Sequence, residues 1–126
     1  MDVSRIKLMA FDLDGTLTQH KSPLSDKNRA VLEQLSKRYK LIMAGAGMCR
    51  RIFEQMGRFP IDIIGNYGMQ YAEFDSGTGE LVIKEDNVMP VDRETVEKRV
   101  TMLREKYGFT DFAGDNAEYH ASGCVT

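Results

Sequence analysis

FDLDGTLT, residues 11–18, directly follows the apolar run IKLMA of residues 6–10. Asp12 and Asp14 therefore lie at the end of a segment that is typical of a buried β-strand. A buried carboxylate without a partner is costly, and two carboxylates this close resist ionising together. This pair, followed by Gly15 and Thr16, indicates a chemical site rather than a turn whose acids only cap a helix.

The composition is that of a globular protein and argues against several classes of function. The chain has 126 residues, 42% hydrophobic and 29% charged, with a formal net charge of −2. This charge provides no basic field for nucleic acid or an anionic membrane, and no apolar run approaches the roughly 20 residues of a membrane span. Cys49 and Cys124 are too few for a disulfide framework or a zinc site. We therefore expect a cytoplasmic protein with neither nucleic acid nor membrane as a partner.

Strands and helices alternate over the first 65 residues. Residues 6–11 predict a strand buried on both faces, and residues 22–40 predict a helix with Ser25 as its N-cap. A short strand within residues 40–44, a helix within 48–57 and a strand over 61–65 follow. This order favours a parallel sheet in an α/β architecture.

The pattern changes after Gly68. Residues 69–74 and 80–85 flank the turn DSGTG and predict a β-hairpin. The clearest helix lies within residues 90–108, with Asp92 as its cap and Gly108 as its end. Its apolar stripe consists of Val96, Val100, Leu103 and Tyr107. Residues 109–126 predict loop and one strand. We place the boundary between two parts of the chain after residue 85.

The two aspartates suit phosphoryl transfer. Ligands of open α/β sheets bind beyond the carboxyl ends of the strands, which is where Asp12 is predicted to lie. Its carboxylate can attack an electrophile, and Asp14 can serve as general acid and then base. A hard cation such as Mg²⁺ would relieve their repulsion. Gly15 allows a tight turn, and Thr16 can orient Asp12.

An apolar strand followed by D-x-D-G-T-L resembles the first motif of the haloacid dehalogenase (HAD) superfamily, whose members are mostly phosphatases. The resemblance implies a three-layer Rossmann-like α/β core, with residues 1–85 as its N-terminal part. It implies that residues 86–126 begin an α/β cap of C2 type, inserted after the second motif. It assigns Asp12 as nucleophile and Mg²⁺ ligand. It assigns Asp14 as acid/base, with its backbone carbonyl as a further ligand.

The second motif of the family is a hydroxyl at the end of the next strand. Here the strand ends in AGAG, Ala44 to Gly47, which has no hydroxyl. The Cof-like branch would place the hydroxyl at Gly45 and the phosphomannomutase branch at Gly47. Backbone N–H groups of Gly45, Ala46 and Gly47 can still hold phosphate. The alternative is a turn kept small for close packing. The turn at residues 66–68 also resembles these two branches.

Several other residues invite a functional interpretation that we consider weaker than a structural one. AGDNAEY at residues 113–119 lacks the second acid of the family's metal motif. His20 and His120 have no metal-ligand spacing. Cys49 begins a helix, where a thiol pKa can fall, and Arg50 and Arg51 could meet a phosphate. We favour packing for Cys49 and solvent exposure for the arginines.

The sequence therefore predicts a Mg²⁺-dependent phosphohydrolase that acts on a small phosphorylated metabolite, with a sugar phosphate as one option, through an aspartyl-phosphate. The alternatives are a phosphohexomutase of phosphomannomutase type and a non-catalytic module with the HAD fold. The family's third-motif Lys and downstream Asp pair have no candidate before Thr126. We therefore expect a fragment of a longer protein, inactive by itself. Substrate identity and oligomeric state stay open.

Overall fold

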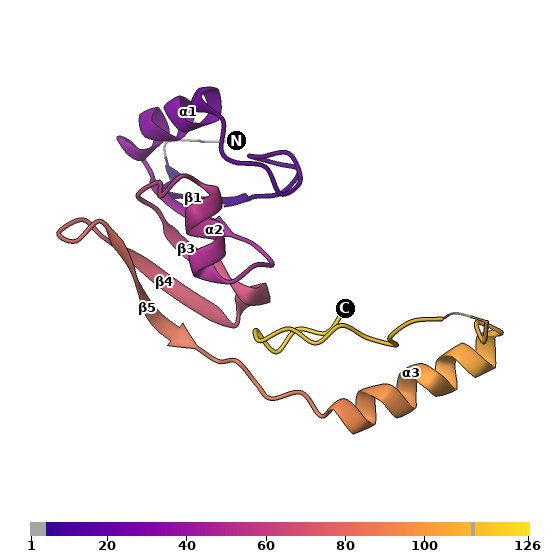
Figure 1. Ribbon diagram of the computed structural model, residues 1–126. Helices are drawn as coiled ribbons and strands as arrows, with labels where there is room; N and C mark the ends of the chain where they lie inside the picture. Colours follow the sequence, from indigo (N-terminus) through magenta and orange to yellow (C-terminus); the bar gives the residue numbers. More distant parts are fainter. Residues whose placement is uncertain (1–4, 112) are drawn as a thin grey trace. The chain divides into compact units, whose positions relative to one another are not determined.

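A computed structural model describes residues 5–111 and 113–126 of the chain (Figure 1). The chain divides after Asn87 into two compact units, and each is described by itself. The first unit holds the predicted strand–helix alternation and the hairpin, and the second holds the long helix. Of the helices that the structure describes, none combines the length and the apolar character that crossing a bilayer requires.

The first unit is built on one five-stranded sheet in the order β1-β2-β3-β4-β5. Its strands are β1 (Leu8–Asp12), β2 (Lys40–Ala44), β3 (Asp62–Gly65), β4 (Gln70–Asp75) and β5 (Glu80–Asp86). The first three strands are parallel, and the hairpin of β4 and β5 joins the edge of β3 in antiparallel fashion. The predicted α/β class is confirmed. The sheet is mixed because the hairpin continues it.

Two helices follow the first two strands, as the sequence predicts. The first is α1 (Asp26–Ser36), and its predicted N-cap is confirmed because Ser25 Oγ accepts a 3.2 Å hydrogen bond from the Asn28 N–H. The second is α2 (Cys49–Gln55). Its C-terminal end leads into Gly57, which adopts a φ of 60°. A turn of 3₁₀ helix, η2 (Asn66–Gly68), connects β3 to β4.

The hydrophobic core of the first unit lies between the two helices and one face of the sheet. Leu32 of α1, Ile52 and Phe53 of α2, and Met43 and Ile63 of the sheet are all buried in it. The described residues of this unit thus form two layers, a sheet and a helical layer. They account for part of the three-layer arrangement that the resemblance implies.

β1 differs from its prediction as a strand buried on both faces. It begins at Leu8, and no residue in it is fully buried. Met9 and Phe11 pack against the core, whereas Leu8 on the opposite face is 49% exposed. The prediction was wrong because apolar composition does not reveal a strand's neighbours. β1 is the first strand of the described sheet and pairs only with β2.

The second unit, Val88–Thr126, contains α3 (Arg93–Tyr107) and the segments on either side of it. Both predicted ends are confirmed. Asp92 accepts a 3.1 Å hydrogen bond from the Thr95 N–H, and Gly108 ends the helix with a φ of 76°. The apolar stripe is only half covered, since Leu103 and Tyr107 are exposed. Instead of a strand, the C-terminal segment contains an isolated bridge between Tyr119 and Val125.

The end of β3 passes unusually close to the AGAG turn. A Cβ on Gly65 would lie 2.7 Å from the Gly47 carbonyl oxygen and 2.8 Å from both the nitrogen and the Sγ of Cys49. The Asn66 N–H donates to the same Gly47 carbonyl at 2.7 Å, and the Gly45 N–H donates to the Ile64 carbonyl at 3.0 Å. The absence of a side chain at Gly65 therefore determines where the turn lies.

We predict that Gly65→Ala destabilises the first unit by about 1–3 kcal/mol, because backbone atoms surround the site of the new methyl group and cannot move aside cheaply. The matched control is Gly77→Ala in the exposed hairpin turn, where a Cβ would approach only the Asp75 carboxylate, at 3.2 Å. Urea unfolding of both variants measures the difference. Equal stabilities for the two variants would contradict the close approach.

Candidate active site

The sequence that follows β1 folds back on itself in a tight loop. The Leu13 carbonyl accepts hydrogen bonds from the N–H groups of Leu17 and Thr18, both at 3.0 Å. Gly15 has a φ of 85°, which few residues other than glycine adopt readily, as the sequence predicts. Leu13 is buried in the core and anchors the loop. Residues 13–22 are called the 13–22 loop below.

Asp12 lies at the carboxyl end of β1 and is exposed. The Thr16 hydroxyl donates to Asp12 Oδ2 at 3.1 Å, which is the orienting contact that the sequence suggests. In the parallel ladder, Asp12 is the register partner of Ala44, the last residue of β2. The structure therefore places the Asp12 backbone beside the start of the AGAG turn.

The Asp14 carboxylate is turned toward the 13–22 loop and α2. Its Oδ1 accepts hydrogen bonds from Gln55 Nε2 at 2.8 Å, from the Lys21 N–H at 2.9 Å and from the Thr18 hydroxyl at 3.5 Å. The Gln55 bond, followed by the Lys21 bond, holds the pKa of Asp14 below its ordinary value of 3.8. The charge of Arg51 lowers the pKa further. Asp14 is therefore stabilised in its ionised form.

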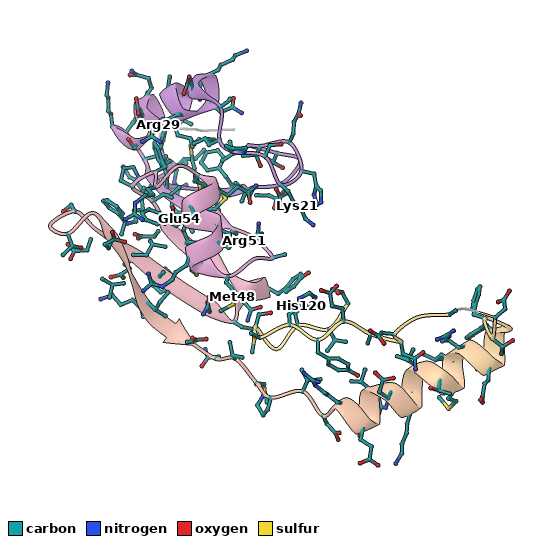
Figure 2. All side chains as sticks on the ribbon, in the orientation of Figure 1. Lys21, Arg29, Met48, Arg51, Glu54 and His120 are labelled. Carbon is teal, nitrogen blue, oxygen red and sulfur yellow. The ribbon has the colours of Figure 1, made fainter. Side chains whose placement is uncertain are left out.

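Gln55 is a site residue that the sequence analysis does not identify, and Arg51, which it considers as a phosphate ligand but assigns to solvent, lies in the same cluster. Gln55 Nε2 also donates to the Ser22 carbonyl at 3.1 Å, and Gln55 Oε1 accepts from Arg51 Nη1 at 2.8 Å. Arg51 Nη2 lies 4.0 Å from Asp14 Oδ2. Figure 2 labels Arg51 on α2 and Lys21 on the 13–22 loop. The spacing of four residues between Arg51 and Gln55 was a usable signal for their pairing, but nothing local linked either residue to Asp14.

The AGAG turn offers fewer backbone donors than the sequence suggests. The Gly45 N–H is engaged by the Ile64 carbonyl, whereas the N–H groups of Ala46 and Gly47 donate to no other residue that the structure describes. Neither Gly45 nor Gly47 has a positive φ. A Cβ on Gly45 would lie 3.0 Å from Ile52 Cδ1, so close packing explains this glycine at least in part.

The other residues that the sequence analysis considers for a function make contacts within the fold. Cys49 is fully buried, and burial raises the pKa of its thiol, so packing rather than reactivity accounts for it. His20 lies near enough to Asp14 for its charge to lower the pKa of that carboxyl. In the second unit, Asn116 donates to Glu97 at 2.8 Å and ties the AGDNAEY segment to α3. His120 contacts the Thr126 hydroxyl at 2.9 Å.

The oxygen ligands near the loop are of the type that a hard cation prefers, but they are few. Asp12 contributes an exposed carboxylate, and carboxylate and carbonyl oxygens are the ligands that Mg²⁺ prefers. The Asp14 carboxylate is already engaged by Gln55 and Lys21. Within the described residues, no three His, Cys, Asp or Glu side chains gather closely enough to hold a metal ion.

We predict that Gln55→Met raises the pKa of Asp14 toward 3.8, because the strongest donor to its ionised form is removed. A carboxyl whose folded pKa is lowered adds stability above its unfolded pKa and loses it as the pH falls through the folded value. The variant should therefore lose on the order of 1 kcal/mol at neutral pH, and this gap should close in acid. NMR titration of the Asp14 carboxyl and urea unfolding at both pH values measure the two effects.

The control for this prediction is Gln34→Met. Gln34 is an exposed residue of α1 whose amide oxygen accepts a hydrogen bond from Lys37 only three residues away. Its loss should leave both the Asp14 pKa and the pH dependence of stability unchanged. An unaltered Asp14 pKa in Gln55→Met would contradict the role of Gln55.

Neither a family model nor a curated protein sequence matches the chain. Solved structures do match. A phosphatase of the HAD enzyme superfamily from Bacteroides thetaiotaomicron aligns with a TM-score of 0.55 and 16% identity over 85% of this chain and 38% of its own. An IMP-bound IMP-nucleotidase from Plasmodium falciparum gives 0.63 and 14% over 94% and 38%. A haloacid dehalogenase-like hydrolase from B. subtilis gives 0.51 and 23% over 81% and 34%.

The chain thus spans little more than a third of the length of each of these three structures. At these identities the likeness concerns the fold. It agrees with the resemblance carried by DLDGT of residues 12–16, which lies where β1 ends and the 13–22 loop begins. The chain therefore shares its fold with part of these haloacid dehalogenase superfamily structures.

Proposed function

We propose that the chain carries the nucleophile of a phosphohydrolase that forms an aspartyl-phosphate on Asp12. The observation that supports this proposal is the exposure and the hydrogen bonding of the Asp12 carboxylate. It is exposed at the carboxyl end of a strand, and Thr16 holds one of its two oxygens. The other oxygen, Oδ1, accepts no hydrogen bond from the described residues and is available for attack.

In the proposed reaction, Asp12 Oδ1 attacks phosphorus, and the ester oxygen of the substrate leaves with the electron pair of the P–O bond. Water then attacks the aspartyl-phosphate, which releases inorganic phosphate and restores the carboxylate. Asp14 would accept the proton of that water. Its hydrogen bonds from Gln55 and Lys21 keep it ionised, so it is prepared for this base step. In the first step Asp14 would act in its protonated form and donate its proton to the leaving ester oxygen, which produces the carboxylate that accepts the proton of water in the second step.

A divalent cation is part of the proposal. The Asp12 carboxylate and the Asp14 main-chain carbonyl would hold Mg²⁺, whose charge would reduce the repulsion between nucleophile and phosphoryl group. Without a cation, the negative charge of the Asp12 carboxylate would repel a dianionic phosphate strongly at the short distance that attack requires. Further ligands are needed beyond the two that this loop offers.

The proposed substrate is a small phosphorylated metabolite. An open cleft of about 530 Å³ borders the 13–22 loop, and its lining includes Thr16, Ser22 and Asn28. Asp12 and Asp14 lie outside this lining, and Thr16, whose hydroxyl donates to Asp12, connects the cleft to the nucleophile. This volume lies within the range of small-molecule sites, and the lining is rich in hydroxyl and amide groups that suit a polar compound. Two of the structures with this fold carry names that describe phosphate-ester hydrolysis, a HAD phosphatase and an IMP-nucleotidase.

We predict that beryllium fluoride, a mimic of the phosphoryl group, forms an adduct with the wild-type chain in the presence of Mg²⁺, observed as bound signals in ¹⁹F NMR. Asp12→Asn should abolish the adduct because an amide oxygen is a poor nucleophile and a poor metal ligand. In any form of the protein that turns over substrate, this variant should lose more than tenfold in rate, or about 1.4 kcal/mol.

Asp111→Asn, which changes an exposed aspartate of the second unit, is the matched control and should leave the adduct intact. Circular dichroism should show that both variants keep the fold. An adduct that survives in Asp12→Asn would remove Asp12 from the nucleophile role. The absence of an adduct with the wild-type chain would contradict the prediction.

A further inference from the structure

The guanidinium of Arg51 occupies the space that a side chain at Gly47 would fill. A Cβ on Gly47 would lie 2.2 Å from Arg51 Nη2, 2.4 Å from Nε and 2.6 Å from Cζ. All three distances are far shorter than a van der Waals contact, so the guanidinium lies directly against the turn. The cationic guanidinium thus lies at Gly47, one of the two positions where the family's second motif would provide a hydroxyl.

The surroundings of Arg51 fix its guanidinium while leaving it accessible. Nη1 donates to Gln55 Oε1 at 2.8 Å, and this hydrogen bond orients the planar guanidinium group. Nη2 is 4.0 Å from Asp14 Oδ2, too far for a hydrogen bond. The side chain is 49% exposed. Of the five N–H donors of a guanidinium, one donates to Gln55, and the others make no hydrogen bond to the described residues.

The position of this guanidinium relates it to the nucleophile. Gly47 lies three residues beyond Ala44, the register partner of Asp12. The AGAG turn and the start of the 13–22 loop are thus adjacent at the carboxyl edge of the sheet. Arginine is suited to phosphate because its planar fork can donate two parallel, charge-assisted hydrogen bonds.

We propose that Arg51 binds the phosphoryl group of the substrate beside Asp12, in place of the hydroxyl that the AGAG turn does not provide. The proposal rests on the proposed function, because it assigns a ligand to the same site. It also explains Gly47, since any larger residue there would displace the guanidinium from the turn. Arg51 is thus a binding residue for a phosphate monoester or for inorganic phosphate.

The competing interpretation is that Arg51 serves only as an ion-pair partner of Asp14. Exposed pairs of this kind contribute little, and a separation of 4.0 Å is at the limit for an ion pair. The two interpretations differ in what a phosphate titration detects. An ion-pair partner affects stability alone, whereas a phosphate ligand affects the affinity for the anion.

The test measures the binding of inorganic phosphate to the full chain by isothermal titration calorimetry at fixed pH and Mg²⁺ concentration. Arg51→Met should weaken binding at least about tenfold, and Gly47→Ala should weaken it in the same direction by displacing the guanidinium. Arg51→Lys keeps the charge but loses the fork, so its affinity should fall between those of wild type and Arg51→Met. Thermal unfolding of each variant identifies any loss of fold, and Arg51→Lys serves if Arg51→Met does not fold.

Arg50→Met is the matched control. Arg50 is the preceding residue of α2, it is exposed, and its removal changes the net charge by the same amount. Its phosphate affinity should stay within about twofold of wild type. Equal affinities for Arg51→Met and Arg50→Met would overturn the proposal, as would a wild-type chain without measurable phosphate binding. If phosphate binding depends on Arg51 while Asp12 forms no beryllium fluoride adduct, the inference stands and the proposed reaction fails.

Discussion

The hydrogen bond from Gln55 Nε2 to Asp14 Oδ1 connects parts of the chain that are 41 residues apart. It joins the 13–22 loop to the end of α2, where the Leu24 N–H also donates to the Gln55 carbonyl at 3.1 Å. The loop is also held by the buried Leu13, by its own turns and by the 2.7 Å hydrogen bond from Asn28 Nδ2 of α1 to the Leu17 carbonyl. Because one carboxamide contacts Asp14, Ser22 and Arg51, the positions of the acid and of the guanidinium depend on each other.

The packing at the carboxyl edge of the sheet explains why so few atoms suffice to shape the site. Gly65 lets β3 approach the AGAG turn, the Asn66 N–H holds the Gly47 carbonyl, and Gly47 leaves room for Arg51. The first and the last of these steps depend on the absence of a side chain. Glycines at such close approaches are determined by packing, and this packing places a guanidinium rather than a hydroxyl at the end of β2.

Local features of the fold could be predicted from the sequence, because their causes are local. The caps at Ser25 and Asp92, the helix end at Gly108 and the turn at Gly15 each depend on residues a few positions away. The exposure of β1 could not be predicted, since it depends on which strands and helices lie beside it. For Cys49 the prediction of packing is confirmed, since burial in the core outweighs any effect of its place at the start of α2.

The candidate site likewise contains residues that local sequence predicts and residues that only the tertiary fold brings in. Asp12, Asp14 and the Thr16 contact lie within five consecutive residues, 12–16, so the motif predicts them. Gln55 and Arg51 reach the loop only through the tertiary fold, and no spacing in the sequence links them to Asp14. The Gly45 N–H was a candidate phosphate donor by its position in a glycine-rich turn, but the sheet uses it to bond to Ile64.

A crystal structure of the chain with Mg²⁺ and beryllium fluoride would test the central claim most directly, because it locates both the attachment point and its neighbours. Our account predicts beryllium bonded to a carboxylate oxygen of Asp12, with the fluorides accepting hydrogen bonds from Arg51 and Asp14 still bonded to Gln55. Beryllium fluoride attached to another residue, or an Asp12 adduct from which Arg51 points away, would contradict it.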